Sequence, residues 1–444
     1  MKTTIFRDFA RYASLNVLGM LALSGYILAD TFFVSKGLGT NGLTALNLAI
    51  PVYSFIHGSG LMIGMGGGIR YAVYRSRGEQ AAADRIFMQA LYLAAAFAAF
   101  FVLAGLFFTG TILFLFGADD SVFGMADTYL RVILLFAPAF LLNNVLLCFV
   151  RNDGAPQLSM AAMIGGSLSN VVLDWVFIFP CGMGIFGAAF ATGLAPVISL
   201  LILLPHRLRG KNGFHAVRCR PEGRPLAGIL SSGVPSLVTE VSSGVVMIVF
   251  NSILLRLAGN VGVAAYGVIA NLSLVVIAIY TGIAQGIQPI VSRCTGQGDR
   301  HGAGMVLRCG LIAMLALSAV IYAGVFFGAA SIAAVFNSEG DPRLQQLAAD
   351  GLRLYFTACP FAGFNVILSV YFTAAGHPRP AQIIAVLRGF AVIVPMAFVL
   401  ARLGGIAGVW CAFPAAELLV AAVGLCFLFS AGKREGKRAA KNAS

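Results

Sequence analysis

Four polar residues lie within long apolar stretches of this 444-residue chain, and their side chains suit the binding of a small cation. Asp30, Asn170, Asp174 and Thr192 offer two carboxylates, an amide oxygen and a hydroxyl. Hard oxygen donors of this kind fit a sodium ion or an exchangeable proton. An acid at the centre of a bilayer costs roughly 2.5–3.5 kcal/mol or more, so such an acid is kept where it binds, pairs or moves something.

Spacing along the chain places these four residues together. Asn170 and Asp174 are four residues apart, so they share one face of a helix. At the rise of a helix, Asp30 and Asp174 each lie about 9 Å below the outer end of their apolar segments, and Thr192 lies about 12 Å below it. Two carboxylates at one depth resist simultaneous ionisation, so that one of them binds a proton more readily.

The elements that must position these residues are membrane-spanning helices. The chain is 59% hydrophobic and only 11% charged, whereas a soluble domain is about 25% charged. Runs of about 20 apolar residues match the thickness of a bilayer core, and their backbone groups must pair internally, which favours helices. Twelve such runs are predicted, at 12–34, 43–67, 86–108, 126–150, 157–179, 185–205, 228–256, 261–289, 303–328, 350–373, 380–402 and 404–430.

The net charge of +13 reflects membrane topology rather than binding to nucleic acid. With the N-terminus inside, 24 of the 30 Lys and Arg residues fall on the cytoplasmic side of the twelve predicted helices. This distribution follows the positive-inside rule. It predicts a multi-pass protein of the plasma (cytoplasmic) membrane with both termini in the cytoplasm.

The chain also repeats itself. Residues 39–83 align with 259–303 at a constant offset of 220, and the later matches, including Pro138 with Pro360, follow an offset of 222. Each copy holds six predicted helices, so the copies share one orientation and form parallel repeats. The predicted organisation is an N-terminal six-helix lobe at 1–205, a basic cytoplasmic linker at 206–225, a C-terminal six-helix lobe at 226–432 and a basic cytoplasmic tail at 433–444.

Two further acids lie near mid-membrane in the second half. Glu240 and Glu417 are candidate substrate-cavity residues that would neutralise a cationic compound, and the equal alternative is a structural acid paired with Ser, Thr or Arg. The eight cysteines form no CxxC pair, so neither a disulfide framework nor a zinc site is expected. No nucleotide-binding or catalytic motif is found, which predicts a protein that is not an enzyme, has no catalytic residues and needs no cofactor other than a coupling ion.

Several segments resemble the multidrug and toxic compound extrusion (MATE) family. They are ADTFFVSKGLGTNGLTALNLAIP (29–51), RNDGAPQLSM (151–160), SLSNVVLDWVFIF (167–179) and GIFGAAFAT (184–192). The resemblance implies an all-α, MATE/MOP-type membrane protein, and a function as a monomer is expected because twelve helices of one chain already enclose a pathway. In several family members an Asp, an Asn, an Asp and a Thr form the cation site of the N-terminal lobe. Asp30, Asn170, Asp174 and Thr192 match them, whereas Trp175 stands where the family often has Pro.

The implied activity is antiport. A proton or sodium ion would enter at the four residues, which would be metal ligands only if sodium is the ion, and amphipathic cationic drugs would leave by alternating access. A lipid-linked saccharide flippase of the same superfamily is the alternative, although such proteins tend to have cationic cavities and extra helices. A major-facilitator transporter is disfavoured because its GxxxD(R/K)xGRR pattern is missing from the second loop.

Overall fold

The structure is a computed structural model that describes residues 2–443 apart from 209, 211 and 338–339. The side chains of residues 2–4, 40, 207 and 431–443 also lie outside the description, and with them the side chains of the predicted basic tail at 433–444. Helices make up nearly all of the described residues, which contain no strand. The all-α fold class predicted from the sequence is therefore confirmed.

The first half of the chain forms seven helices. They are α1 (Lys2–Ser76), α2 (Gln80–Phe107), α3 (Thr109–Leu115), α4 (Asp120–Leu135), α5 (Ala137–Asn152), α6 (Pro156–Ile178) and α7 (Gly184–Leu208). The second half forms α8 (Gly223–Gly296), α9 (Arg300–Phe336), α10 (Pro342–Tyr355), the 3-10 turn η1 (Phe356–Ala358), α11 (Cys359–Ala374), α12 (Pro378–Val386), the π-helical turn η2 (Leu387–Ala391) and α13 (Ile393–Ala443). Three of these helices are interrupted by a glycine in a left-handed conformation: Gly39 in α1, Gly259 in α8 and Gly405 in α13.

The described helices supply twelve membrane spans. Nine helical segments are long and apolar enough to cross a membrane, and the pair α4–α5, bent by 46°, adds one more. The breaks at Gly259 and Gly405 each divide one of the nine into two spans. The twelve spans coincide with the twelve apolar runs in the sequence.

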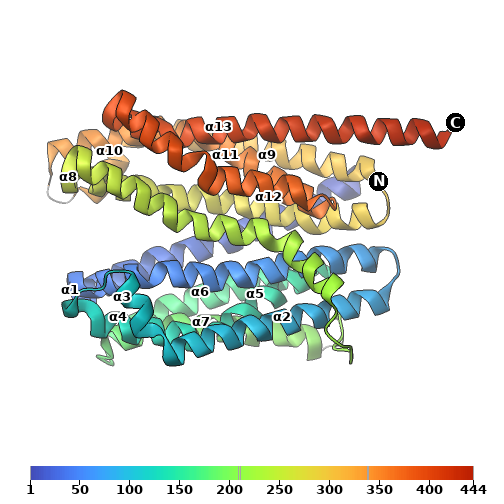
Figure 1. The fold of residues 1–444 in the computed structure, drawn as a ribbon, viewed down its shortest axis with the longest axis horizontal. Helices are drawn as coiled ribbons and strands as arrows, with labels where there is room; N and C mark the ends of the chain where they lie inside the picture. The colour runs from blue at the N-terminus through green and yellow to red at the C-terminus, as the bar shows by residue number, and fades with distance from the viewer. Residues whose placement is uncertain (1, 209, 211, 338–339, 444) are drawn as a thin grey trace.

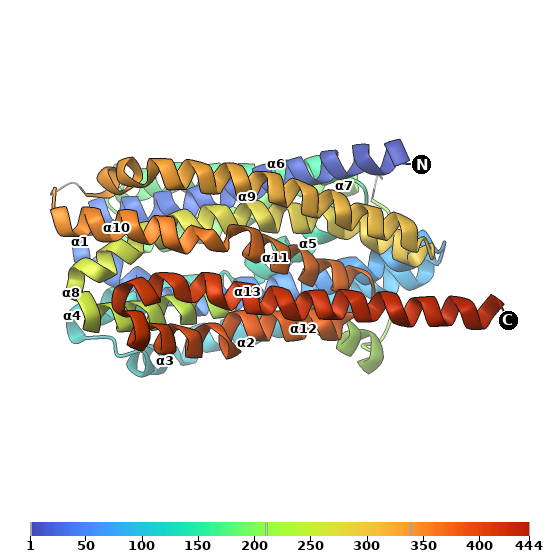
Figure 2. The same cartoon turned by 90° about the horizontal axis from the view of Figure 1, so that it is seen from above.

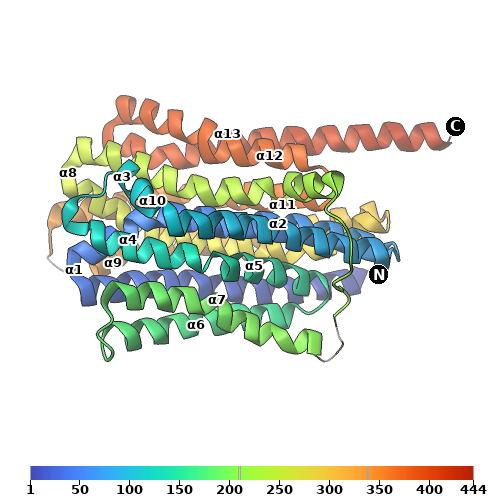
Figure 3. The ribbon, with the colours of Figure 1, turned by 60° about the horizontal axis from the view of Figure 1, so that its bottom comes forward.

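The helices gather into two groups that lie side by side, with α1–α7 in one and α8–α13 in the other (Figure 1). They run along the long axis of the molecule, and both ends of the chain lie at the same end of it (Figure 2). The linker between α7 and α8 crosses that end as well (Figure 3). We call it the basal end, marked by Asp8, Arg77 and Arg293. From there α8 runs obliquely away from α1, so these two helices diverge toward the far end (Figure 1).

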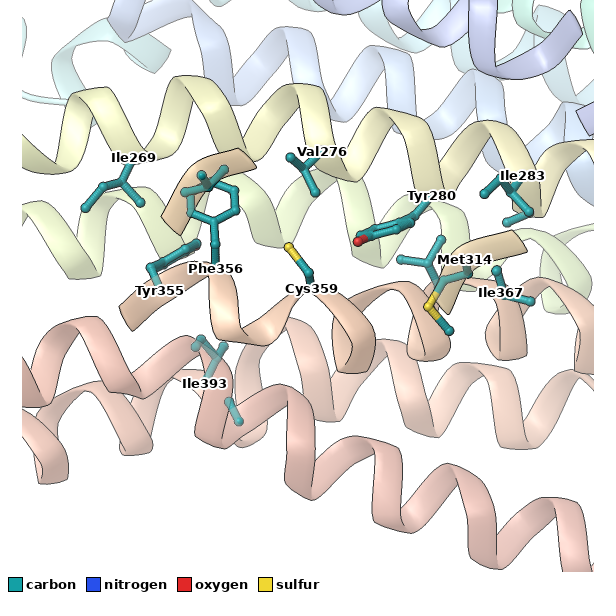
Figure 4. Packing of buried hydrophobic residues seen from close by; sticks show 14 of the residues in the cluster. Ile269, Val276, Tyr280, Ile283, Met314, Tyr355, Phe356, Cys359, Ile367 and Ile393 are labelled. Atoms are coloured by element: carbon teal, nitrogen blue, oxygen red, sulfur yellow. The ribbon is translucent and has the colours of Figure 1, made fainter. Parts of the chain in front are cut away.

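Each half has an apolar core of its own, and the start of α1 also packs into the core of the second half through Ile5, Phe9 and Ala13. In the first half Phe87, Phe149 and Phe214 pack together, with ring centroids 4.7–5.8 Å apart. In the second half Tyr280 lies beside Met314 and Cys359 among aliphatic side chains (Figure 4). The Tyr280 hydroxyl is satisfied by Ser318 at 2.7 Å. Because the two cores are largely distinct, most of the packing within each half can persist if the halves move relative to each other.

The halves meet backbone to backbone near the basal end. At five of the described glycines of α1 and α8, a Cβ atom would overlap the backbone of the facing helix, and one of them is Gly296, which faces Val73. The other close approaches pair Gly66 with Ile229, Gly233 with Met62, Gly282 with Val17 and Gly286 with Ala13. Small residues are the means by which membrane helices approach this closely.

Polar side chains reinforce the same interface. Asn152 and Gln288 exchange two amide hydrogen bonds of 3.0 Å across the halves. Arg293 of α8 forms an ion pair with Asp8 of α1 at 2.8 Å, and Arg77 donates to the Gly296 carbonyl at 3.3 Å. The structure therefore has its basal end closed.

The linker is attached to the first half through Asp153, a carboxylate buried at the C-terminal end of α5. Asp153 accepts from the Tyr71 hydroxyl at 2.6 Å and from the Gly213 amide at 2.8 Å, and its other partners are Arg75 and His206. The neighbouring stretch of linker is held by α2, where the Tyr92 hydroxyl donates to a linker carbonyl at 2.8 Å. The basic segment thus packs on the first half at its basal end.

Candidate functional site

The predicted cation-site residues come from three helices of the first half. Asp30 lies in the part of α1 before the Gly39 break, Asn170 and Asp174 lie one turn apart on α6, and Thr192 lies on α7. All four are buried, with Asn170 and Asp174 fully so. The helical spacing places Asn170 and Asp174 on one face of α6, and the packing of α6 against α7 sets Thr192 beside them.

Asn170 links the other two polar residues of α6 and α7. With its amide nitrogen directed at the carboxylate, it donates to Asp174 Oδ2 at 3.0 Å and accepts from the Thr192 backbone amide at 3.2 Å. The opposite amide orientation would set the Asn170 oxygen against the Asp174 carboxylate, and two acceptors repel. The Thr192 hydroxyl donates to the Ala188 carbonyl of its own helix at 3.0 Å. Asn170 therefore positions Asp174, and its own oxygen is occupied.

Two carboxylate oxygens at this site have no hydrogen-bond partner among the described residues. Asp30 Oδ1 and Asp174 Oδ1 are both buried and unpaired, and the two carboxylates interact electrostatically. An unsatisfied buried acceptor costs about 1–3 kcal/mol, and more when it is charged. A proton or a small cation held between the two acids would give the unpaired oxygens a partner and would reduce the repulsion between the two carboxylates.

Tyr129 completes the surroundings of the two acids. This buried residue of α4 interacts with the Thr192 side chain and electrostatically with Asp30 and Asp174. The sequence did not point to it, because nothing in its local spacing distinguishes Tyr129 from the other tyrosines of the chain. Only the packing of α4 against α7 reveals it.

A cavity adjoins this site on the side that faces the second half. It encloses about 780 Å³ including the space open to solvent, and Thr192 belongs to its wall. Tyr26, Tyr53 and His57 line it from α1, and Glu240 lines it from α8. The surface of the cavity is mostly apolar, although about half of the residues that line it have a polar or charged side chain.

A chain of polar contacts runs along the cavity wall. The Tyr26 and Tyr53 hydroxyls form a hydrogen bond of 2.7 Å, and the Tyr53 ring stacks on His57 with centroids 5.9 Å apart. Tyr53 also interacts electrostatically with both Asp30 and Glu240. Tyr53 therefore lies within electrostatic range of an acid of each half.

The structure separates the two acids proposed for the substrate cavity. Glu240 is half-buried and lines the cavity. Glu417 is fully buried in the second half and is absent from the cavity lining. It forms an ion pair with Arg388 at 2.6 Å and accepts from Asn365 at 2.7 Å. For Glu417 the geometry corresponds to the alternative reading, a structural acid paired with arginine.

The second half lacks an equivalent of the two-carboxylate site at the matching positions. The repeat offsets place Phe250, Val392 and Met396 where the first half has Asp30, Asn170 and Asp174. Phe250 is fully buried and its ring stacks on Tyr266 with centroids 5.2 Å apart. Both copies of the repeat therefore have the same fold, but only the first copy has the paired acids at these positions.

A family model described as MatE matches residues 17–176 and 235–399, which together make up well over half of the chain. This chain belongs to the MatE family. It is an efflux transporter of the multidrug and toxic compound extrusion type and a multi-pass membrane protein.

Characterised relatives match it along nearly the whole length. The multidrug export protein MepA of Staphylococcus saprophyticus is 24% identical over 430 residues, which cover 96% of this chain and 94% of that protein. MepA of Staphylococcus aureus strain MSSA476 is 23% identical with the same coverage. The alignment thus includes both repeats of this MATE chain.

Solved structures share its fold. A MOP superfamily transporter from Pyrococcus furiosus Vc1 (DSM3638) superposes with a TM-score of 0.88 at 24% identity, covering 95% of each chain. A MATE protein in the bent conformation superposes with a TM-score of 0.89 at 23% identity, covering 99% of each chain. The MATE/MOP architecture of twelve helices is therefore confirmed for this chain.

Proposed function

We propose that this protein exports amphipathic cationic compounds across the plasma membrane in exchange for protons or sodium ions. Asp30 and Asp174 receive the coupling cation, Thr192 adds a hydroxyl, and Asn170 holds Asp174 in place. Glu240 attracts the positive charge of the exported compound within the cavity. A single chain suffices, because the cavity is formed by the two halves of one molecule, and no resident cofactor takes part.

The pair of unpartnered buried carboxylate oxygens carries this proposal. Buried acids in a membrane protein are expensive unless they bind or move a charge. The two acids adjoin a cavity that is open to solvent and whose wall includes Thr192, Glu240 and three aromatic side chains of α1. Cation binding and drug binding can then influence each other through the polar wall that runs from Asp30 to Glu240.

The proposed cycle uses the closed basal end as one of two states. The excess of basic residues assigns this end, with both termini, to the cytoplasm. The compound enters while the basal end is open and leaves while it is closed and the far end is open. A cation bound at the two acids stabilises the state that releases the compound, and this difference in affinity couples the two flows.

The alternative function is that of a lipid-linked saccharide flippase. One observation bears on it: the described cavity is lined by a basic residue, Arg151, as well as by Glu240. Transport by a flippase of this kind would not depend on the two buried acids. The coupling experiment therefore separates the two functions.

The test is efflux from proteoliposomes under separately imposed proton and sodium gradients. Wild type is compared with Asp174→Asn, which keeps the shape of the side chain and removes its charge. The matched control is Asp127→Asn, because Asp127 pairs with Arg131 on the surface of α4, outside the site.

Efflux driven by one gradient, retained in the Asp127→Asn protein and lost in the Asp174→Asn protein, is the expected result, and the effective gradient identifies the ion. Efflux that ignores both gradients, or that persists unchanged in Asp174→Asn, would contradict the antiport proposal and favour the flippase.

A further inference from the structure

Arg151 is a fully buried arginine that the proposed antiport does not use. It lies in the last turn of α5 and is 1% exposed. Its Nη1 atom donates to the Asn16 oxygen at 2.9 Å and to the Gln285 oxygen at 2.6 Å. Its Nη2 atom faces two sulfur atoms, Met65 Sδ at 3.3 Å and Cys148 Sγ at 3.5 Å. These partners are dipoles and soft acceptors without charge.

No carboxylate pairs with this guanidinium among the described residues, and its Nε atom has no hydrogen-bond partner there. Two other buried charges, Asp153 and Glu417, each have an arginine partner, and the unpaired acids Asp30 and Asp174 belong to the proposed cation site. A buried charge without a counter-ion is strongly unfavourable. Its retention at this place calls for an anion that the protein alone does not supply.

The cavity offers the route for that anion. Arg151 and its partner Gln285 both belong to the cavity lining, as do Glu240 and Thr192. The lining therefore carries one basic and one acidic side chain of opposite charge. A molecule that bears both a cationic and an anionic group would satisfy the two at once.

We propose that Arg151 binds the anionic group of transported zwitterionic amphipaths, such as a carboxylate or sulfonate, while Glu240 receives the cationic group. This inference rests on the proposed export function and narrows its substrate class. A guanidinium is suited to the role because it pairs with a carboxylate through two parallel hydrogen bonds.

The position of Gln285 suggests how the anion gains access. Arg151 belongs to the first half, whereas Gln285 lies on α8 of the second half, beside the backbone contacts that close the basal end. Opening that end withdraws Gln285, so Nη1 keeps its bond to Asn16 and has one donor available for a substrate from the cytoplasm. Closing it restores the Gln285 contact, which competes with the bound anion and promotes its release toward the far end.

A purely structural role for Arg151, as a latch between the halves, makes a different prediction. A latch would affect all ligands alike, whereas an anion site must distinguish ligands by their negative charge. Two dyes provide the matched pair: rhodamine 110 has a free carboxylate, and rhodamine 123 is its methyl ester. The readout is the ratio of their dissociation constants, measured by fluorescence with the purified full-length protein in lipid nanodiscs.

The wild type should bind rhodamine 110 more tightly than the ester. In Arg151→Gln this preference should fall roughly tenfold, and in Arg151→Lys, which keeps the charge, much of it should remain. The matched control is Arg131→Gln, because Arg131 is an exposed arginine of α4, and its dye ratio should equal that of the wild type.

An equal affinity of the wild type for both dyes would overturn the proposal even if the Arg151 variants failed to fold. An equal loss of affinity for both dyes in Arg151→Gln would also overturn the proposal, because this is the result expected of a latch. Adding phosphatidylglycerol to phosphatidylcholine nanodiscs should leave the preference unchanged. If the preference for rhodamine 110 disappeared in the nanodiscs that contain phosphatidylglycerol, Arg151 would bind a lipid headgroup, which would contradict the proposal that it binds a transported anion.

Failure of the export function would be recognised separately. Rhodamine 123 efflux from proteoliposomes measures antiport without any anionic group on the dye. Loss of gradient-driven efflux in the wild type concerns the antiport, whereas the dye ratio concerns Arg151 alone.

Discussion

Gly39 and Gly259, which are 220 residues apart, adopt the same unusual backbone conformation. Gly39 has φ 65° and ψ −158°, and Gly259 has φ 63° and ψ −154°. Both interrupt a long helix at the far end of the bundle and divide it into two spans. The two glycines occupy matching positions of the sequence repeat, and their backbone conformations match as well. This region of φ and ψ is accessible almost only to glycine.

Alanine at either position should destabilise the protein through the backbone alone. A Cβ atom at Gly39 or Gly259 would meet no neighbour within 4 Å, so the expected cost is that of the conformation, about 1–3 kcal/mol. Thermal unfolding of Gly39→Ala and Gly259→Ala in detergent should show similar decreases in Tm. Gly267→Ala, at a helical glycine of α8 that also faces open space, is the control and should not lower Tm. Unchanged Tm values in both test variants would contradict the strained conformation.

Closure of the basal end should depend on the bare backbone at Gly233. A Cβ atom there would overlap the carbonyl group of Met62 across the interface. We expect Gly233→Ala to favour the state with an open basal end, and hence to make the buried native thiol of Cys148, which lines the cavity, more reactive toward a soluble thiol reagent, as measured by mass spectrometry of the labelled peptide. Gly244→Ala, where α8 faces open space, is the control. Equal labelling of the two variants would mean that the contact does not govern closure.

Transport should also depend on Asn170, although it offers no free oxygen to a cation. Asn170→Ala removes the donor to Asp174 and the acceptor for the Thr192 amide, so Asp174 loses its fixed orientation. Misplacement of a functional group by about 1 Å can reduce a rate by 10²-fold. We expect a fall of roughly tenfold or more in gradient-driven efflux. Ser169→Ala is the control, since Ser169 bonds only to the carbonyl of Gly166 in its own helix, and equal efflux in both variants would refute the positioning role.

Asp153 should be the carboxylate on which the basal end of the first half most depends for stability. Its side chain is fully buried between Tyr71, Arg75 and His206. Asp153→Ala leaves these partners unsatisfied and should lower the free energy of unfolding by about 3 kcal/mol. Asp350→Ala, which removes an exposed partner of Arg353, should change it by less than about 1 kcal/mol. The comparison is made by thermal unfolding of the purified proteins in detergent, and equal Tm values would contradict it.

The twelve spans were predictable because each depends on about 20 consecutive residues, and a bilayer demands that such runs be helical. The proximity of Asn170 and Asp174 was predictable for a similar reason, because a spacing of four fixes their common face. The match of Gly39 with Gly259 was visible in the alignment, whereas their left-handed conformation was not. The sequence alone is therefore sufficient to predict features that depend on neighbouring residues within one helix.

Contacts between distant helices could not be predicted in this way. Tyr129 joins the acids only through the packing of α4 against α7, and Arg388 reaches Glu417 from another helix. The sequence did not decide whether Glu417 is a substrate-cavity acid or a structural acid, because its burial and its partner depend on tertiary packing. Arg151 was counted as one more cytoplasmic charge, and only the structure places it in the cavity lining.

The glycine contacts between α1 and α8 have a mechanical consequence. Where side chains from two helices interdigitate, they must change rotamers before the helices can separate. Where Gly282 faces Val17 and Gly286 faces Ala13, backbone lies against backbone with little to interlock. At these contacts the two helices can separate with little change of side-chain rotamer, whereas Ile5 and Phe9 of α1 pack in the core of the second half and must leave it if the halves part. The rate at which the halves part would then depend on these apolar contacts of α1 as well as on the hydrogen bonds and the ion pair of the basal end.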